Sequence, residues 1–263
     1  MRHPEPFVDI HCHLIPGIDD GSQSWDETLA MARMAVNDGI GAIICTPHQL
    51  HNYSCNHGNM IRERTEELQK TLDDNGIDLI VLPGGDVRIE NGMVSKLASG
   101  EVMTLGDQYR HVLLELPHEM YIPLEKLLDE LADEGLVGIL SHPERNQGIL
   151  ENPSVLPGLV DRGCLMQVTA NSLTGTFGEN LKRFTEDLIC QGLVHFVSTD
   201  AHSPKARRPL LRRAFDRVAE LAGWEIATDL CCRYPACIAA GEDIPFGPVS
   251  VPQTRHRPQR RAG

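Results

Sequence analysis

Two histidines separated by one residue end the first apolar run of the chain. The segment reads Val8-Asp-Ile-His-Cys-His13, so its last residues include His11 and His13. Side chains two apart on a β-strand point to the same side, and these two imidazoles can therefore hold one metal ion together. Neutral imidazoles are ligands of borderline divalent metals such as zinc, iron and manganese. The pair predicts a metal site at the carboxyl end of this strand.

Four later apolar runs end in the same kind of chemistry. Their final residues are imidazoles or carboxylates, namely His48, Glu115, His142, and the pair Asp200 and His202. A single histidine of this kind is usually a hydrogen-bonded core residue or a helix cap. A packed core has little use for so many ionisable groups, because each would need a partner. We interpret the five strand ends as one metal centre.

The elements that must position these residues alternate between strands and helices. Apolar, β-branched runs predict strands at 8–13, 41–46, 78–83, 111–116, 137–141, 164–169 and 194–199. A capping box at Ser24-Trp-Asp-Glu27 begins a helix that Gly39 ends. Further helical patterns lie at 60–75, 123–134, 153–162, 178–191 and 205–222.

This alternation is typical of α/β proteins with a parallel sheet. Seven strand–helix units predict a closed, TIM-like (βα)7 barrel, and an open doubly wound sheet is the alternative. One edge of an open sheet would not easily gather ligands from so many strands. In barrels of this type functional groups lie at the carboxyl ends of the strands, where the candidate ligands fall.

Length and composition set the domain organisation. The chain of 263 residues has no linker-like segment in its middle, so we expect a single domain over residues 1–244. Residues 245–263 are rich in proline and arginine and have no periodicity. We expect this tail to be disordered.

Charge and cysteine content exclude several classes of protein. The formal net charge is −13, and four arginines lie in the last nine residues, so the preceding body is still more acidic. Such a surface repels nucleic acid and anionic membranes. No apolar run is long enough for a membrane helix, and we expect a soluble, cytoplasmic protein. The eight cysteines are expected to be mainly buried free thiols.

Five longer blocks carry a resemblance to a known family. They read Asp9-Ile-His-Cys-His13, Leu14-Ile-Pro-Gly-Ile-Asp-Asp-Gly21, Thr46-Pro-His48, His142-Pro-Glu-Arg145 and Asp200-Ala-His202. In this order the chain resembles the polymerase and histidinol phosphatase (PHP) superfamily. More narrowly, it is similar to the bacterial manganese-dependent protein-tyrosine phosphatases of capsule and exopolysaccharide systems. The resemblance implies a distorted seven-stranded barrel and hydrolysis of phosphotyrosine at three divalent ions, with manganese as the expected metal and iron or zinc as alternatives.

The resemblance also assigns individual residues. It implies that nine residues are metal ligands: His11, His13, Asp20, His48, Asp86, Glu115, His142, Asp200 and His202. Asp19 is the neighbouring alternative to Asp20. Arg145, Arg207 and Asp20 would act on the substrate, and the two arginines would bind its phosphate. The family pattern has glutamate where Asp86 stands here, so a bridging carboxylate would have a stem shorter by roughly 1.5 Å. Either the backbone moves toward the metals or one metal binds weakly.

The residues themselves fit phosphate-ester hydrolysis. Three divalent ions together with four carboxylates would give the site a net charge of about +2, which matches the charge of a phosphate monoester dianion. Bound metals can polarise phosphoryl oxygens and lower the pKa of a bridging water, so that hydroxide attacks in line. An arginine fork can hold equatorial phosphate oxygens.

Each arginine also has a simpler interpretation. Arg145 could form a surface salt bridge with Glu144 or Glu151, and Arg207 could belong to a solvated helix face with the arginines that follow it.

Three functions are compared. The first is a phosphotyrosine-protein phosphatase whose partner is a bacterial tyrosine autokinase. The second is a phosphatase for a small metabolite such as histidinol phosphate, and the third is an inactive regulatory module with structural metals. No cysteine has an arginine six positions later, so covalent thiol catalysis is not expected. Cys12 is interpreted as a small strand residue on the opposite face from the ligands. The sequence does not fix the oligomeric state.

Overall fold

The computed structural model describes residues 5–245 and 247–251. Its strands all pair in parallel and form two sheets. The first sheet has the order β1-β2-β4 and the second the order β3-β5-β6-β7-β8-β9. The strands are β1 (Phe7–Cys12), β2 (Ile40–Cys45), β3 (His48–Gln49), β4 (Ile80–Pro83), β5 (Asp86–Arg88), β6 (His111–Glu115), β7 (Val137–Ser141), β8 (Leu165–Thr169) and β9 (Phe196–Ser198).

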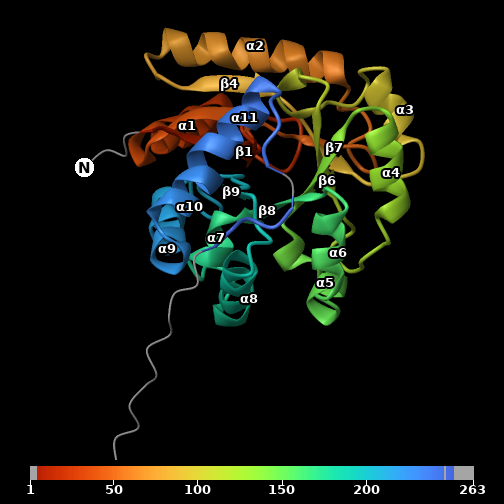
Figure 1. The fold of residues 1–263 in the computed structure, drawn as a ribbon. Coiled ribbons are helices and arrows are strands. Elements are labelled where there is room, and N and C mark those ends of the chain that lie inside the picture. Colours follow the sequence, from red (N-terminus) through yellow and green to blue (C-terminus); the bar gives the residue numbers. More distant parts are fainter. Residues whose placement is uncertain (1–4, 246, 252–263) are drawn as a thin grey trace, which may run out of the picture.

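The helices surround the strands, which occupy the middle of the molecule (Figure 1). The α-helices are α1 (Trp25–Asp38), α2 (Gly58–Asp74), α3 (Met93–Ala98), α4 (Glu125–Asp133), α5 (Gln147–Glu151), α6 (Val155–Asp161), α7 (Ala170–Leu173), α8 (Glu179–Cys190), α9 (Arg212–Ala222), α10 (Trp224–Thr228) and α11 (Tyr234–Ala240). Short 3₁₀ turns are η1 (Leu105–Asp107) and η2 (Pro143–Arg145), and η3 (Asp229–Arg233) is a π-helical turn.

Alternating strands and helices with parallel pairing confirm the α/β prediction. Within the described residues nine strands replace the seven expected, because two expected strands are interrupted and continue as β3 and β5. Pro47 interrupts the first, since it has no N–H for a ladder. Gly85 interrupts the second and lies so close to Gln49 that a Cβ there would be 2.3 Å from its side-chain oxygen.

The two sheets approach each other at β1 and β9. The His13 N–H donates to the Ala201 carbonyl at 2.9 Å, and the Asp200 N–H donates to the His11 carbonyl at 2.8 Å. A parallel bridge joins Cys12 to Ala201. These contacts lie outside the continuous ladders, so a closed seven-stranded barrel stays a prediction.

Three clusters of buried apolar residues hold the described part of the chain together, and two of them join the sheets to each other and to the helices. One gathers side chains from both sheets, among them Ile10, Ile44, Leu113 and Phe196, so the sheets share one apolar interior. Ile238 of α11 also joins this cluster. The larger cluster packs helices against the outer faces of the strands and includes buried Cys12. Burying such side chains contributes roughly 1.5–3 kcal/mol each.

Several helix predictions are confirmed and one begins at the wrong residue. In α1 the Ser24 hydroxyl accepts from the Glu27 N–H, and Gly39 ends the helix in a left-handed conformation. The helix expected at 205–222 begins only at Arg212. The Asp38 carboxylate at the end of α1 accepts hydrogen bonds from the N–H groups of Leu211 and Arg212 and so fixes that start.

Part of the carboxyl-terminal segment lies on the folded body. The Val249 N–H donates to the Gly192 carbonyl at 2.7 Å, and Nε2 of His195 lies 3.0 Å from the Gly247 carbonyl. The rest of the tail, residues 252–263, lies outside the described residues.

All eight cysteines are free thiols. Five of them are buried, as expected, whereas Cys55 and Cys190 are exposed and Cys237 is half-buried. Among the described helices none is both long and apolar enough to cross a membrane.

Candidate metal centre

The carboxyl ends of the parallel strands bring all nine predicted ligands together. Four overlapping groups of side chains each have ligand atoms within 4.8 Å of one another. Four of the residues belong to two groups, which suits several ions that share ligands. The groups are His13, Asp20, His48 and His202; His11, His142 and Asp200; His11, His13 and Asp86; and His48, Asp86 and Glu115.

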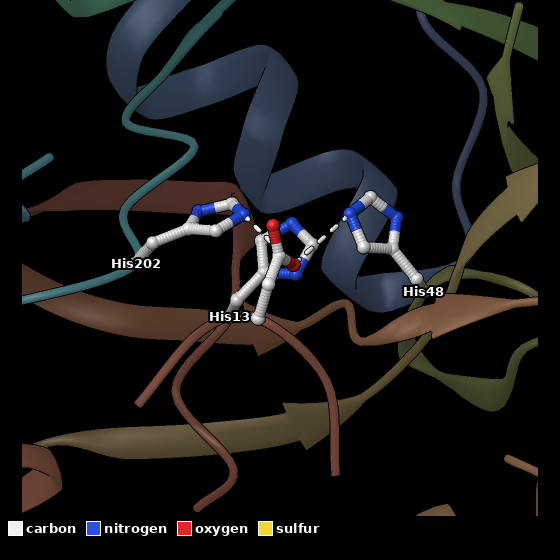
Figure 2. Close-up of side chains that lie close together, drawn as sticks. His13, His48 and His202 are labelled. Carbon is white, nitrogen blue, oxygen red and sulfur yellow. Dashed lines mark ion pairs between the residues drawn. The ribbon is translucent and has the colours of Figure 1, made fainter. Parts of the chain in front are cut away.

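The first group surrounds one carboxylate at the mouth of the site. Oδ1 of Asp20 lies 3.3 Å from Nε2 of His48 and 3.4 Å from Nε2 of His202. In Figure 2 the rings of His13, His48 and His202 face one another, and dashed lines mark these two ion pairs. The side chain of Asp20 is 54 % exposed, so this group opens to solvent.

The structure gives the two neighbouring aspartates different positions. Oδ2 of Asp19 lies 2.7 Å from Nδ1 of His13, and its oxygens also accept the N–H groups of Gly21 and His48. Asp19 therefore holds His13 from behind, so that Nε2 of His13 is directed into the cluster. Asp20 is the one that faces the other imidazoles.

Asp86 lies deeper, at the start of β5. Its Oδ2 atom is 3.2 Å from Nδ1 of His48 and 3.6 Å from Nε2 of His11, so the short side chain reaches two groups. The Asp86 N–H donates to the Pro47 carbonyl at 3.1 Å, which holds the backbone against the interrupted strand next to it.

Two candidate ligands have unusual backbone conformations. His142 has φ 34° and Asp200 has φ 50°, both in the left-handed region that favours glycine. Such conformations cost on the order of 1–3 kcal/mol and persist where the surrounding structure fixes them. Here the turn η2 after His142 and the hydrogen bond from the Asp200 N–H to His11 do so.

Neighbouring carboxylates favour protonation of two of the imidazoles. Burial lowers the pKa of His11, but Asp200 and Asp86 raise it more, to about 9. Burial likewise opposes the charge on His48, but the carboxylates of Asp20 and Asp86 beside it raise its pKa to about 12. A cation that binds these imidazoles must therefore displace their protons.

The pKa values of three other residues in the cluster are shifted in different directions. Burial and the nearby His202 lower the pKa of His13 to about 4, and burial and Arg145 lower that of His142 to about 3. Burial, followed by the negative charge of Asp86, raises the pKa of Glu115 to about 7. Neutral imidazoles of this kind are ready to bind a metal.

Unpaired polar atoms in the cluster indicate that a metal ion would fit this site. Among the described residues, four buried atoms of the cluster have no hydrogen-bond partner: both carboxylate oxygens of Asp86, Nδ1 of His48 and Nε2 of His202. An unpaired buried polar atom costs roughly 1–3 kcal/mol. Coordination would satisfy all four atoms, and imidazole with carboxylate suits manganese, iron or zinc.

The two predicted arginines meet at one carboxylate. Nη1 of Arg145 and Nη2 of Arg207 form ion pairs with Oδ2 of Asp200, while Oδ1 of Asp200 lies 3.4 Å from Nε2 of His11. Although burial raises the pKa of Asp200, His11 and Arg207 hold it well below its usual range. Both arginines line a cavity of about 170 Å³ together with six of the candidate ligands.

The structure gives these arginines other surroundings than the simpler interpretations do, and Arg145 pairs with Asp200 rather than with Glu144 or Glu151. Glu144 is fully buried and accepts hydrogen bonds from the Thr169 N–H at 2.9 Å and the Ser172 hydroxyl at 2.7 Å, so it is not a surface partner of Arg145. Arg207 precedes α9 and lies in the cavity wall, whereas Arg212 packs over Phe7.

Two buried residues that support the cluster were not expected. Oε1 of Gln167 in β8 lies 2.8 Å from Nδ1 of His11, which directs Nε2 of His11 toward the cluster. Asp9 accepts the N–H groups of His11 and Thr199 and thereby joins the ends of β1 and β9. The signal for both was a polar residue inside an apolar strand, but their partners are distant in sequence.

Comparisons with known proteins identify the family of this chain. The family profile described as capsular polysaccharide synthesis, CpsB/CapC, matches residues 7–240. The chain is 40 % identical over 203 residues to the tyrosine-protein phosphatase YwqE of Bacillus subtilis, covering 76 % of this chain and 79 % of that protein. It is 26 % identical to the tyrosine-protein phosphatase CpsB of Streptococcus pneumoniae, covering 85 % of this chain and 94 % of that protein.

Solved structures extend the comparison to the fold. A chain from the crystal structures of YwqE from Bacillus subtilis and CpsB from Streptococcus pneumoniae, described as unique metal-dependent tyrosine phosphatases, superposes with a TM-score of 0.87 at 35 % identity. The match covers 92 % of this chain and 99 % of that one. Dihydropyrimidinase from Brevibacillus agri, at 8 % identity and a TM-score of 0.55 over 94 % of this chain and 73 % of that one, shares the fold alone. The family match over most of its length shows that this chain belongs to the CpsB/CapC family of capsular polysaccharide synthesis.

Proposed function

We propose that this protein is a metal-dependent phosphotyrosine-protein phosphatase that acts in capsule or exopolysaccharide regulation. The observation that carries the proposal is the convergence of nine candidate ligands at the strand ends, next to a cavity that six of them line together with Arg145 and Arg207. The tyrosine-protein phosphatases among its relatives support it. The proposed substrate is a tyrosine-phosphorylated protein, and a bacterial tyrosine autokinase is the proposed partner.

The proposed cofactor is a set of three divalent ions, with manganese as the expected metal. Overlap among the four ligand groups supports more than one ion, because shared ligands can bridge neighbouring metals. When bound, such ions polarise phosphoryl oxygens and lower the pKa of water enough to give a nucleophile near neutral pH. Three divalent ions with four carboxylates leave two positive charges for the phosphate dianion.

The chain's own residues bind and orient the substrate. The guanidinium groups of Arg145 and Arg207 would hold equatorial phosphoryl oxygens, where charge is redistributed in the transition state. The imidazoles of His202 and His48, which lie 3.4 Å and 3.3 Å from Oδ1 of Asp20, keep the pKa of Asp20 well below its usual range. Asp20 therefore stays a carboxylate at the mouth of the cavity, where it can accept a hydrogen bond from the attacking water.

The finer architecture also remains a proposal. We infer a distorted barrel with seven strand positions in which β2 continues as β3 and β4 as β5, because the two halves keep the same parallel neighbours. Residues 1–244 would form its single domain. The free thiols support a reducing compartment, and we propose that the protein works in the cytoplasm.

A hydrolysis assay tests the function. Purified protein would be stripped with a chelator and supplied with manganese, and release of phosphate from a phosphotyrosine peptide would be compared with release from histidinol phosphate. We expect manganese-dependent hydrolysis of the peptide and little of the metabolite. Preference for histidinol phosphate would favour a metabolite phosphatase. Full activity in protein shown by elemental analysis to be metal-free would refute the metal mechanism.

A further inference from the structure

An aromatic side chain lies against one of the two phosphate-binding arginines. The guanidinium carbon of Arg145 is 5.1 Å from the centroid of the Phe177 ring. Arg145 lines the cavity and its side chain is 21 % exposed, while Phe177 is 37 % exposed. The ring of Phe177 is therefore partly open to solvent and lies against Arg145, which lines the cavity.

The chain presents this ring instead of burying it. Phe177 belongs to neither the clusters of buried apolar residues nor the partly buried residues packed on them, among the described parts of the chain. It lies in the short connection between α7 and α8, where Gly175 and Gly178 have φ 80° and 99°. Hydrogen bonds from Thr176 to the Asn171 carbonyl and from Gly178 to the Gly175 carbonyl hold this turn. An exposed phenylalanine held this way favours contact with something outside the core.

The geometry of a bound phosphate ester determines what that contact is. If Arg145 and Arg207 hold the phosphoryl oxygens, the ester oxygen and its organic group must project toward the open mouth, away from the buried ligands. An aromatic ring attached directly to that oxygen stays close to the phosphate. A ring that packs on Arg145 is then within reach of it, whereas a small alkyl group presents less apolar surface there.

Resting on the proposed function, we propose that Phe177 determines specificity by packing against the aromatic ring of the substrate and so favours aryl over alkyl phosphates. Aromatic pairs prefer offset or edge-to-face arrangements and contribute energy beyond the area they bury. The cation–π contact also limits the orientations of the Arg145 guanidinium. These two effects are separable, because only the ring–ring contact depends on the organic group of the ligand.

Two phosphonates separate the effects without any turnover. Isothermal titration calorimetry on the full-length, manganese-supplied protein would give the Kd of phenylphosphonate and of methylphosphonate, which share one anionic group. We expect the wild type to bind phenylphosphonate more tightly. F177A should raise the Kd of phenylphosphonate by about threefold to tenfold, which is the scale of an aromatic pair. It should raise the Kd of methylphosphonate by less than about twofold. F177Y should keep the preference, because it keeps the ring.

A control and three outcomes decide the matter. Ile80 is 59 % exposed at the start of β4, at the opposite end of the strands from the site, and I80A should change neither Kd. If F177A raised the Kd of both phosphonates equally, Phe177 would act only through Arg145. If it changed neither Kd, Phe177 would not contact the ring of the ligand. Either result overturns this inference and leaves the proposed function intact. If the wild type bound neither phosphonate, the proposed phosphate site would be wrong, and this inference would fail with it.

Discussion

At the scale of single residues, the site depends on how Asp200 divides its two oxygens. Oδ2 pairs with Arg145 and Arg207, while Oδ1 faces the imidazoles of His11, His13 and His202. One carboxylate thus connects the candidate metal ligands to the proposed phosphate-binding groups. The position of a phosphate relative to the metals then depends on this residue, whose own backbone is in a left-handed conformation.

The arginines that meet Asp200 should matter far more than their neighbours. We predict that Arg145→Ala and Arg207→Ala each lower kcat/KM by on the order of 10²-fold, the effect of removing one preorganised donor. Lysine should restore only part of the activity, because it lacks the planar fork. Arg212→Ala and Arg213→Ala are matched controls and should stay near wild type. If Arg208→Ala lost most of its kcat/KM while Arg207→Ala kept it, the assignment of Arg207 would be wrong by one position.

Asp86 allows a test of the shortened carboxylate. Asp86→Asn should lower both bound manganese and turnover, because the side chain reaches two ligand groups and loses its charge. Asp86→Glu should keep activity within about tenfold, or roughly 1.4 kcal/mol in barrier. Metal content measured by elemental analysis would decide the question. Unchanged content in Asp86→Asn would mean that this residue is not a ligand.

At the scale of elements, the sequence predicted which residues come together better than it predicted the details of the scaffold. The ligand-bearing strand ends were visible because apolar runs stop at ionisable residues. β3 and β5 were not, since strands of two and three residues show no periodicity. The choice between Asp19 and Asp20 depends on which way a turn rotates, and the contact between Gln167 and His11 joins residues 156 apart in sequence. Neither is encoded in a local pattern.

The late start of α9 gives a prediction at this scale. Asp38 accepts hydrogen bonds from the first N–H groups of that helix, 2.8 Å from Arg212, in place of a cap from within α9. Asp38→Ala should lower the free energy of unfolding by about 1 kcal/mol, as for other lost helix caps. Asp38→Asn keeps an acceptor oxygen and should cost less. Urea unfolding of the three proteins measures the difference, and equal losses in both variants would contradict the capping role.

At the scale of the whole molecule, acid should destabilise the fold through a histidine far from the metal centre. His111 at the start of β6 is buried, and burial lowers its pKa from 6.5 to about 4 even though Asp243 opposes the shift. Below pH 6.5 the unfolded chain binds a proton that the folded protein does not. The stability that this histidine confers is therefore present at neutral pH and is lost as the pH falls toward 4.

Replacing that histidine should make the free energy of unfolding less dependent on pH in the acid range. Between pH 7 and pH 5 we predict that His111→Leu loses about 1 to 2 kcal/mol less unfolding free energy than the wild type. Urea unfolding at both pH values, with a chelator present throughout, removes the contribution of metal release. Parallel losses in the two proteins would show that His111 does not contribute.

The pairing of β1 with the residues after β9 has a consequence for biosynthesis. His11 leaves the ribosome early, but its partner Asp200 and the last imidazole, His202, follow roughly 10 to 40 s later at ordinary rates of translation. Until then the nascent chain carries an unpaired strand edge and an incomplete set of imidazoles. The complete set of candidate ligands therefore cannot form until nearly the whole domain has been translated.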